Sequence, residues 1–293
     1  MDNPFRMVGI HPFPTVPRQG EKWYQGKPVI SMAILAVILL GCLLCELFIP
    51  KDPTYMDLYH ANQAPNGEFW FGTDTMGRDI FSMIWYGGRI SLFIGFLATA
   101  ISTAFAILFG AFSGLAPRWL DTLMMRFTEI FLSIPGLLLI ILFQAIWGKA
   151  NALSIAVCIG VSGWATVAKV VRTEVKQLRN SEYVVASRCM GAGFFRILWQ
   201  HLIPNFLSAI MFMVVMNIPS AIATESTLSF MGMGLPLEVI SWGSMLSLSE
   251  KALSSGSWWI ILIPGIFLIT TLLCITNIGN YLRKRMTRTE SNL

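Results

Sequence analysis

Six long apolar runs, almost free of charged residues, restrict this chain more than any other feature. They cover residues 29–49, 90–115, 127–147, 152–168, 206–223 and 258–282. A helix needs about 20 apolar residues to cross the hydrocarbon core of a bilayer. Charged residues make up only 13% of the chain, whereas a soluble domain carries about 25%. A single run is compatible with a buried helix of a soluble protein, but six predict an all-α polytopic membrane protein with six transmembrane helices.

The first run is expected to stay in the protein as a membrane span. It follows 28 residues of tail, exceeds a usual signal-peptide core and has no small-x-small cleavage pattern. With a cytoplasmic N-terminus, six spans place 16 of the 21 lysines and arginines on the cytoplasmic side. This asymmetry follows the positive-inside rule, so both termini are expected in the cytoplasm.

The residues give little support for a soluble enzyme or for a nucleic-acid-binding protein. The five cysteines and three histidines are scattered, and the Cys42-x-x-Cys45 pair lies inside the first apolar run. No phosphate-binding glycine loop and no catalytic triad stands out, so we expect no catalytic residue, cofactor or metal in this chain. A nucleic-acid-binding protein would need a basic face on a soluble domain, and none is visible.

The runs divide the chain into a tail, a first helix, an outer segment and a core. Residues 1–28 form a cytoplasmic tail, 29–49 the first transmembrane helix and 50–88 an extracytoplasmic segment. Residues 89–283 form a core of five transmembrane helices that includes a cytoplasmic loop at 172–204, and residues 284–293 form a second cytoplasmic tail.

The loop at 172–204 carries the most informative motif, EYVVASRCMGAGFFRILWQHLIPN at 182–205. It resembles the coupling loop, or EAA loop, of permease subunits of ABC importers. Ala186, Ser187, Gly191 and Pro204 occupy motif positions, whereas Val185 replaces the usual Glu and His201 the usual Ile. This variant resembles the dipeptide, oligopeptide and nickel branch of the family.

Three further blocks extend the resemblance over about residues 70–282, and they contain the charged residues of interest. The block at 71–95 resembles the C-type subunit of peptide permeases, and its Asp74, Arg78 and Asp79 are expected to tie the outer segment to the next span. Glu129 either lines the pathway or pairs at the boundary, and Glu225 either caps a neighbouring helix or lines the outer mouth. The family's acidic C-terminal pattern is absent at 278–283.

The resemblance implies the type I ABC importer permease fold and a non-catalytic subunit that forms half of a pathway for di- or oligopeptides. Its implied partners are a second homologous permease, two ABC ATPases that bind ATP and magnesium, an extracytoplasmic solute-binding protein and the lipid of a prokaryotic plasma membrane. A nickel or metal-chelate substrate is the alternative within the family. A stand-alone secondary transporter or channel, or a non-transporting scaffold, are the alternatives outside it.

Physical reasoning on the motif predicts two short helices that meet at Gly191 and dock in a groove of the ATPase. A helix lying on the lipid headgroups is the alternative. The expected coupling residues are Tyr183, Val184, Ala186, Ser187, Arg188, Gly191, Phe194, Phe195 and Pro204.

Overall fold

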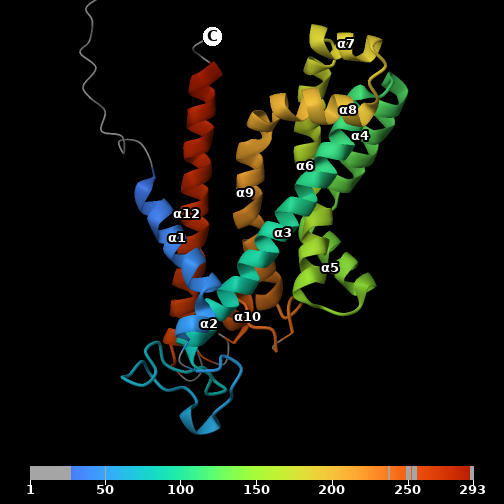
Figure 1. Cartoon of the computed structure of the whole chain (residues 1–293). Helices are drawn as coiled ribbons and strands as arrows, with labels where there is room; N and C mark the ends of the chain where they lie inside the picture. Colours follow the sequence, from blue (N-terminus) through green and yellow to red (C-terminus); the bar gives the residue numbers. More distant parts are fainter. Residues whose placement is uncertain (1–27, 50, 237, 249–251, 253–255, 291–293) are drawn as a thin grey trace, which may run out of the picture.

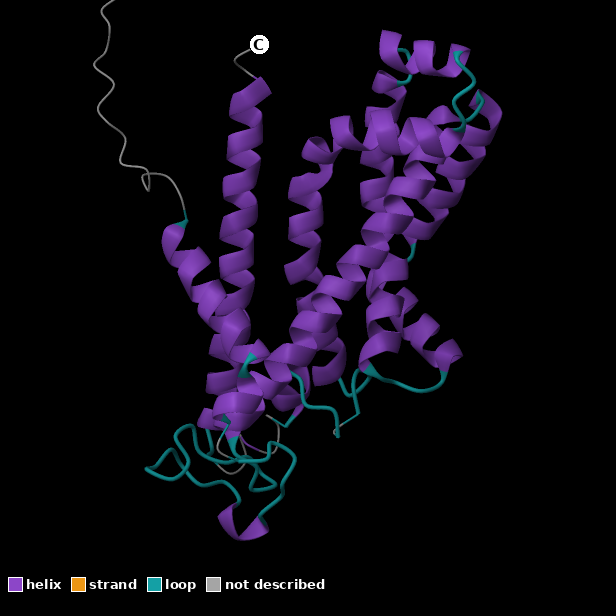
Figure 2. Ribbon diagram, viewed as in Figure 1, coloured by secondary structure: helices purple, strands orange, loops and turns teal. Residues whose placement is uncertain are grey.

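The structure of the protein is a computed structural model that describes residues 28–49, 51–236, 238–248, 252 and 256–290. Within these residues the chain is helical and has no strand beyond one isolated bridge between Thr73 and Asp79; Figure 2 shows the helices and their connecting loops. The all-α prediction is therefore confirmed. The predicted tail at 1–28 lies outside the described residues except for Pro28, as do residues 291–293.

The helices follow one another in a simple order (Figure 1). They are α1 (Val29–Leu43), α2 (Cys45–Phe48), the 3-10 turn η1 (Leu58–His60), α3 (Ile80–Leu115), α4 (Arg118–Ser133), α5 (Gly136–Trp147), α6 (Ala152–Leu178), α7 (Glu182–Cys189), α8 (Phe194–Ile197), the π-helical turn η2 (Leu198–Leu202), α9 (Ile203–Phe230), α10 (Trp242–Ser247) and α12 (Trp259–Glu290).

Among the described residues, four helical stretches are long and apolar enough to cross a membrane. They are α3, α6, the α8–η2–α9 stretch at Phe194–Phe230, and α12 as far as Lys284. The predicted third span is instead a broken pair, because α4 and α5 meet at a bend of 93°. The first apolar run gives α1, whose 15 residues rise about 22 Å, less than the roughly 30 Å hydrocarbon core. The count of six spans therefore remains a prediction.

Local sequence explains where the helices differ from the apolar runs. α3 begins at Ile80, ten residues before its apolar run, because Asp79 accepts a hydrogen bond from the Ser82 backbone N–H at 3.0 Å and caps the helix. The break between α4 and α5 falls at Pro135, which has no N–H to donate and keeps Ile134 in an extended conformation.

Helix α3 runs through the centre of the molecule and packs against α6 and α9 (Figure 1). Small residues allow the close approach: a Cβ at Gly110 would lie 2.6 Å from the Ala168 carbonyl oxygen, and a Cβ at Gly160 would lie 2.9 Å from that of Ala98. Such contacts between small residues are typical of helix packing in membranes. α3 therefore positions α6 and α9, which carry the motif segment between them.

The two ends of the helical bundle differ in character. Figure 1 shows α7 and α8 lying across the end of α6 and α9, at the same end of the molecule as the end of α12. The loop between α2 and α3 and the short α10 lie at the opposite end. The motif segment and the loop between α2 and α3 are thus separated by the full length of the bundle.

Candidate functional site

The motif segment, residues 182–204, folds as two short helices joined by a bend, and we call it the elbow. α7 ends in a Schellman motif, in which the Ala192 N–H donates to the Ser187 carbonyl at 3.0 Å and the Gly191 N–H donates to the Arg188 carbonyl at 2.9 Å. Gly191 has a φ of +83°, a left-handed conformation that residues with a side chain adopt at a cost. Gly191 therefore provides the bend between α7 and α8.

The second arm of the elbow joins α9 through a widened turn. Residues Leu198–Leu202 are π-helical, and the Ile203 N–H donates to the Leu198 carbonyl instead of to the residue four positions earlier. Pro204 follows at the start of α9, where it has no N–H to offer and its ring would crowd the preceding turn of a regular helix. The proline of the motif thus accounts for the π turn, a local irregularity that is frequent at functional sites.

One face of the elbow is fixed to the bundle. Val184, Leu198 and Leu202 are fully or almost fully buried and join a hydrophobic cluster with Val171 and Val175 of α6. Ser187 is 5% exposed on the same side. These residues hold the elbow on α6, and the spacing of Val184 and Ser187, three residues apart in a helix, explains why they share that face.

The opposite face of the elbow is exposed. It presents Tyr183, Ala186, Arg188, Gly191 and Phe195 of the predicted set, and Pro204 is exposed where α9 begins. Among the large apolar residues of the elbow, exposure is largest at Met190, 82%, and Trp199, 69%, which are outside that set, while Phe195 is 66% exposed. Large apolar side chains on an exposed surface indicate contact with another protein or with the membrane.

Aromatic contacts brace the two arms. The His201 ring lies 5.9 Å from that of Tyr183, so the histidine of the variant motif contacts α7 across the elbow. Phe194, half-buried, meets Phe112 of α3 edge to face at 6.1 Å. Phe194 is thus a bracing residue in this subunit, whereas its neighbour Phe195 points outward.

A charged cluster lies directly below the elbow. Asp121 of α4, 4% exposed, is bound by Arg172 and Lys176 of α6, with the Arg172 Nη2 at 2.7 Å, and it accepts a hydrogen bond from the Ser113 hydroxyl at 2.7 Å. Arg179 donates to the Gly114 carbonyl at 3.2 Å. The turn between α3 and α4 is therefore joined to the last turns of α6, from which the elbow begins.

Glu129 lies on an exposed face of α4. Its carboxylate pairs with Arg126 at 2.9 Å, and both side chains are more than half exposed. An exposed pair of this kind contributes about 0–1 kcal/mol to stability.

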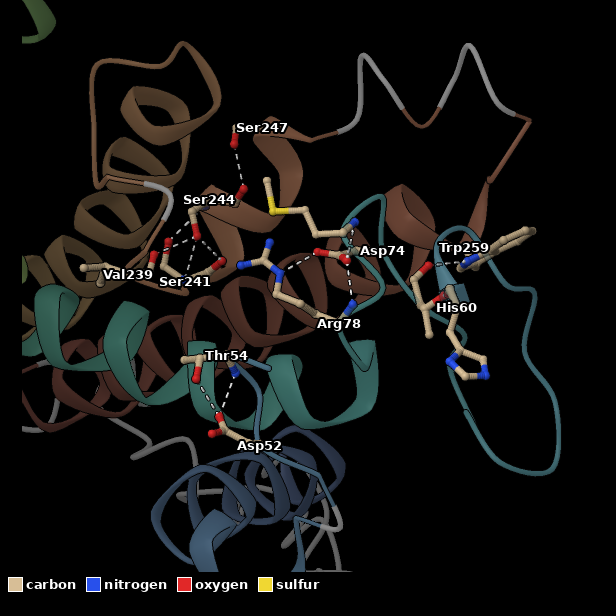
Figure 3. A network of polar contacts seen from close by, with 12 residues as sticks. Asp52, Thr54, His60, Asp74, Arg78, Val239, Ser241, Ser244, Ser247 and Trp259 are labelled. Atoms are coloured by element: carbon tan, nitrogen blue, oxygen red, sulfur yellow. Dashed lines mark hydrogen bonds and ion pairs between the residues drawn. The ribbon is translucent and has the colours of Figure 1, made fainter. Parts of the chain in front are cut away.

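The end of the bundle opposite the elbow holds a clasp of buried polar residues (Figure 3). The Asp74 carboxylate accepts a hydrogen bond from the backbone N–H of Arg78 at 2.8 Å and one from the side-chain Nε of Arg78 at 2.7 Å. Both side chains are at most 4% exposed. The Trp259 indole N–H of α12 donates to the Thr73 carbonyl at 3.1 Å. The loop between α2 and α3 is thereby tied both to the start of α3, through Asp79, and to α12.

Glu225 of α9 is fully buried in a ring of hydroxyls near the same end. It accepts hydrogen bonds from Ser241 at 2.8 Å, from Ser229 at 2.9 Å and from Ser91 of α3 at 3.3 Å. A Cβ on the neighbouring Gly243 would lie 3.0 Å from the Glu225 Oε1. In this subunit Glu225 therefore joins α3, α9 and the start of α10.

Comparison with known proteins places this architecture in a family. Residues 106–288 match the binding-protein-dependent transport system inner membrane components. The chain is 35% identical to the dipeptide transport system permease protein DppC of Bacillus subtilis, over 88% of this chain and 81% of the relative. It is 34% identical to the oligopeptide transport system permease protein OppC of the same organism, over 87% and 83%.

A relative from another organism is equally similar. The oligopeptide transport system permease protein OppC of Haemophilus influenzae is 35% identical to the chain, over 90% of this chain and 85% of the relative. The family match runs from the last turns of α3 into α12 and includes the elbow. This chain belongs to the family of binding-protein-dependent transport system inner membrane components, and it is a multi-pass membrane permease.

Proposed function

We propose that this chain is one of two permease subunits of an ATP-driven importer of di- and oligopeptides. The observation that carries the proposal is the exposed elbow, which lies at one end of a bundle whose relatives are permeases for dipeptides and oligopeptides. The partners implied are a second homologous permease, two ABC ATPases that bind ATP and magnesium, and an extracytoplasmic solute-binding protein. In this scheme the chain performs no chemistry itself.

The geometry favours transmission of movement through α6 and α9. The buried face of the elbow is continuous with the cluster on α6, and its second arm leads through the π turn into α9. A displacement of the elbow by an ATPase would therefore move both helices together. Because interiors are close-packed, such a displacement would change the shape of the space between α6, α9 and α5.

A second subunit is also consistent with the exposed surface of α5. This helix packs chiefly on α6, and Leu138, Leu142 and Ile146 are more than half exposed. The bend at Pro135 interrupts the helix, and irregular backbone at membrane depth occurs only where protein or a water-filled cavity covers it. We propose that the second permease covers the bend and that the pathway lies between the two permeases.

We place the elbow and both termini in the cytoplasm, as the distribution of basic residues favours. Cys189 is an exposed native thiol on the elbow, and the other four cysteines are buried. Labelling of Cys189 by a membrane-impermeant thiol reagent in intact cells would contradict this orientation.

Reconstitution tests the function directly. The complete complex, with its second permease, ATPases and binding protein in liposomes, is expected to accumulate labelled di- or oligopeptides when ATP is supplied on the ATPase side. The permease alone is expected to hydrolyse no ATP. Accumulation by this subunit alone with an ion gradient would support a secondary transporter instead, and uptake of nickel or a metal chelate without peptide uptake would change the substrate.

A further inference from the structure

A cavity of about 200 Å³ lies halfway along the bundle, between α3, α5, α6 and α9. Thr99 lies about 28 Å along α3 and Asn217 about 21 Å along α9, close to the middle of each helix. Gly136, which follows the bend between α4 and α5, is exposed at the mouth of the cavity, as is Ser220 of α9. The cavity therefore opens beside the bend that we assign to the pathway.

Three polar side chains in the cavity wall have no hydrogen-bond partner among the described residues. They are the hydroxyls of Thr99 and Ser102, which are 5% and 3% exposed, and the Nδ2 of the half-buried Asn217. Other hydroxyls in the same wall donate to backbone carbonyls one turn earlier, Ser162 to Cys158 at 2.6 Å and Thr224 to Ser220 at 2.8 Å. Buried polar groups are paired in most proteins. These three atoms are themselves fully buried, so a partner that enters the cavity would meet them once their side chains rotate toward it.

None of the described residues that line the cavity is charged. Glu225 follows the lining residue Thr224, but its carboxylate is held by the serine hydroxyls described above. Placing an ion in such an environment without a counter-charge is costly. A ligand that suits this wall is therefore neutral and offers both hydrogen-bond donors and acceptors.

We propose that this cavity is a subsite for the uncharged main-chain amides of a peptide in transit. Ser and Thr hydroxyls both donate and accept, so Thr99 and Ser102 can accept from a peptide N–H, and the Asn217 amide can donate to a peptide carbonyl. The wall then binds the main-chain amides, which all peptides share, and does not discriminate between peptides by their side-chain charge. A single water molecule needs only about 10–15 Å³ of such space, so the cavity has room for a peptide unit. This inference rests on the proposed peptide transport.

The test compares amide and ester substrates in the reconstituted complex. A depsipeptide, in which one ester replaces an amide, lacks one N–H and keeps nearly the same shape. The ratio of amide to ester uptake is measured for the wild type and for the double variant Thr99→Val and Ser102→Ala. Since the binding protein is the same in both complexes, its own preference cancels when the two ratios are divided.

We expect the double variant to import amide peptides more slowly, with a ratio of amide to ester uptake that falls by roughly fivefold for one lost hydrogen bond. The decrease should be the same for peptides with acidic, neutral and basic side chains. Thr103→Val is the matched control, because Thr103 is on the same helix and its hydroxyl is also unpartnered, but it does not line the cavity. Its ratio should equal that of the wild type.

A second variant tests the requirement for neutrality in the same cavity. Asn217→Asp is expected to lower uptake of acidic peptides relative to neutral ones by about tenfold, because it places a like charge beside the substrate. Three results would overturn the subsite. The first is a ratio of amide to ester uptake that is unchanged in the double variant, and the second is an equal change of that ratio in Thr103→Val. The third is equal uptake of acidic and neutral peptides by Asn217→Asp. Failure of the wild-type complex to import any peptide would instead overturn the proposed function, and the subsite with it.

Discussion

Gly191→Asp is expected to lower peptide uptake at least tenfold while the permease remains in the membrane in normal amount. A Cβ at Gly191 would meet no atom within 4 Å, and Asp tolerates a positive φ better than most residues. The subunit should therefore fold. If the elbow enters a groove of the ATPase, however, the new carboxylate would be desolvated there without a partner, which is costly.

Gly191→Asn separates charge from shape in this experiment. Asn has nearly the same size as Asp and also adopts the left-handed conformation, so it should retain most of the uptake. Membrane abundance and uptake are measured for both variants. Normal uptake by the Asp variant would contradict the docking of the elbow, and equal loss in both variants would show that the backbone conformation alone matters.

Asp121→Ala is expected to have the largest effect on stability. It removes the acceptor that Arg172 and Lys176 share beneath the elbow. Breaking a buried pair costs about 3–5 kcal/mol, and because these two cations are 24% and 32% exposed we expect about 2–3 kcal/mol. The midpoint of thermal unfolding in detergent should fall by on the order of 5–10 °C.

Glu129→Gln provides the control on the same helix. Its pair with Arg126 is exposed, and we expect a change in midpoint of no more than roughly 2 °C. A small effect of Asp121→Ala, or equal effects of the two substitutions, would show that the cluster does not hold the elbow end of the bundle together.

The apolar runs predicted where the long helices lie but not where they end. α3 begins at Ile80 because the side chain of Asp79 caps its first turn, which hydropathy does not show. α6 continues to Leu178 beyond its apolar run, since Arg172 and Lys176 find a partner in Asp121 and remain helical. Residues 127–147 were expected to form one span, and the 93° bend at Pro135 was not predicted.

The elbow was predictable in part. Glycine at the bend follows from the motif, and the structure gives Gly191 a positive φ. The prediction treated Val184 and Phe194 as outward contacts, whereas Val184 is fully buried and Phe194 contacts Phe112. Helical spacing from Val184 to Ser187 would have separated the two faces of α7, but it does not predict the exposure of Met190, which follows the last residue of that helix. The cavity could not be predicted, because its wall combines residues from four helices.

Crosslinking from the elbow tests the central claim most directly. A photoreactive amino acid at Phe195, which is 66% exposed on the elbow, is introduced into an active complex, and one at Trp70, 64% exposed in the outer loop, serves as the control. We predict a crosslink to the ATPase from position 195 and none from position 70. An active complex that forms no ATPase crosslink at 195, or forms one at 70, would contradict both the docking of the elbow and the orientation of the chain.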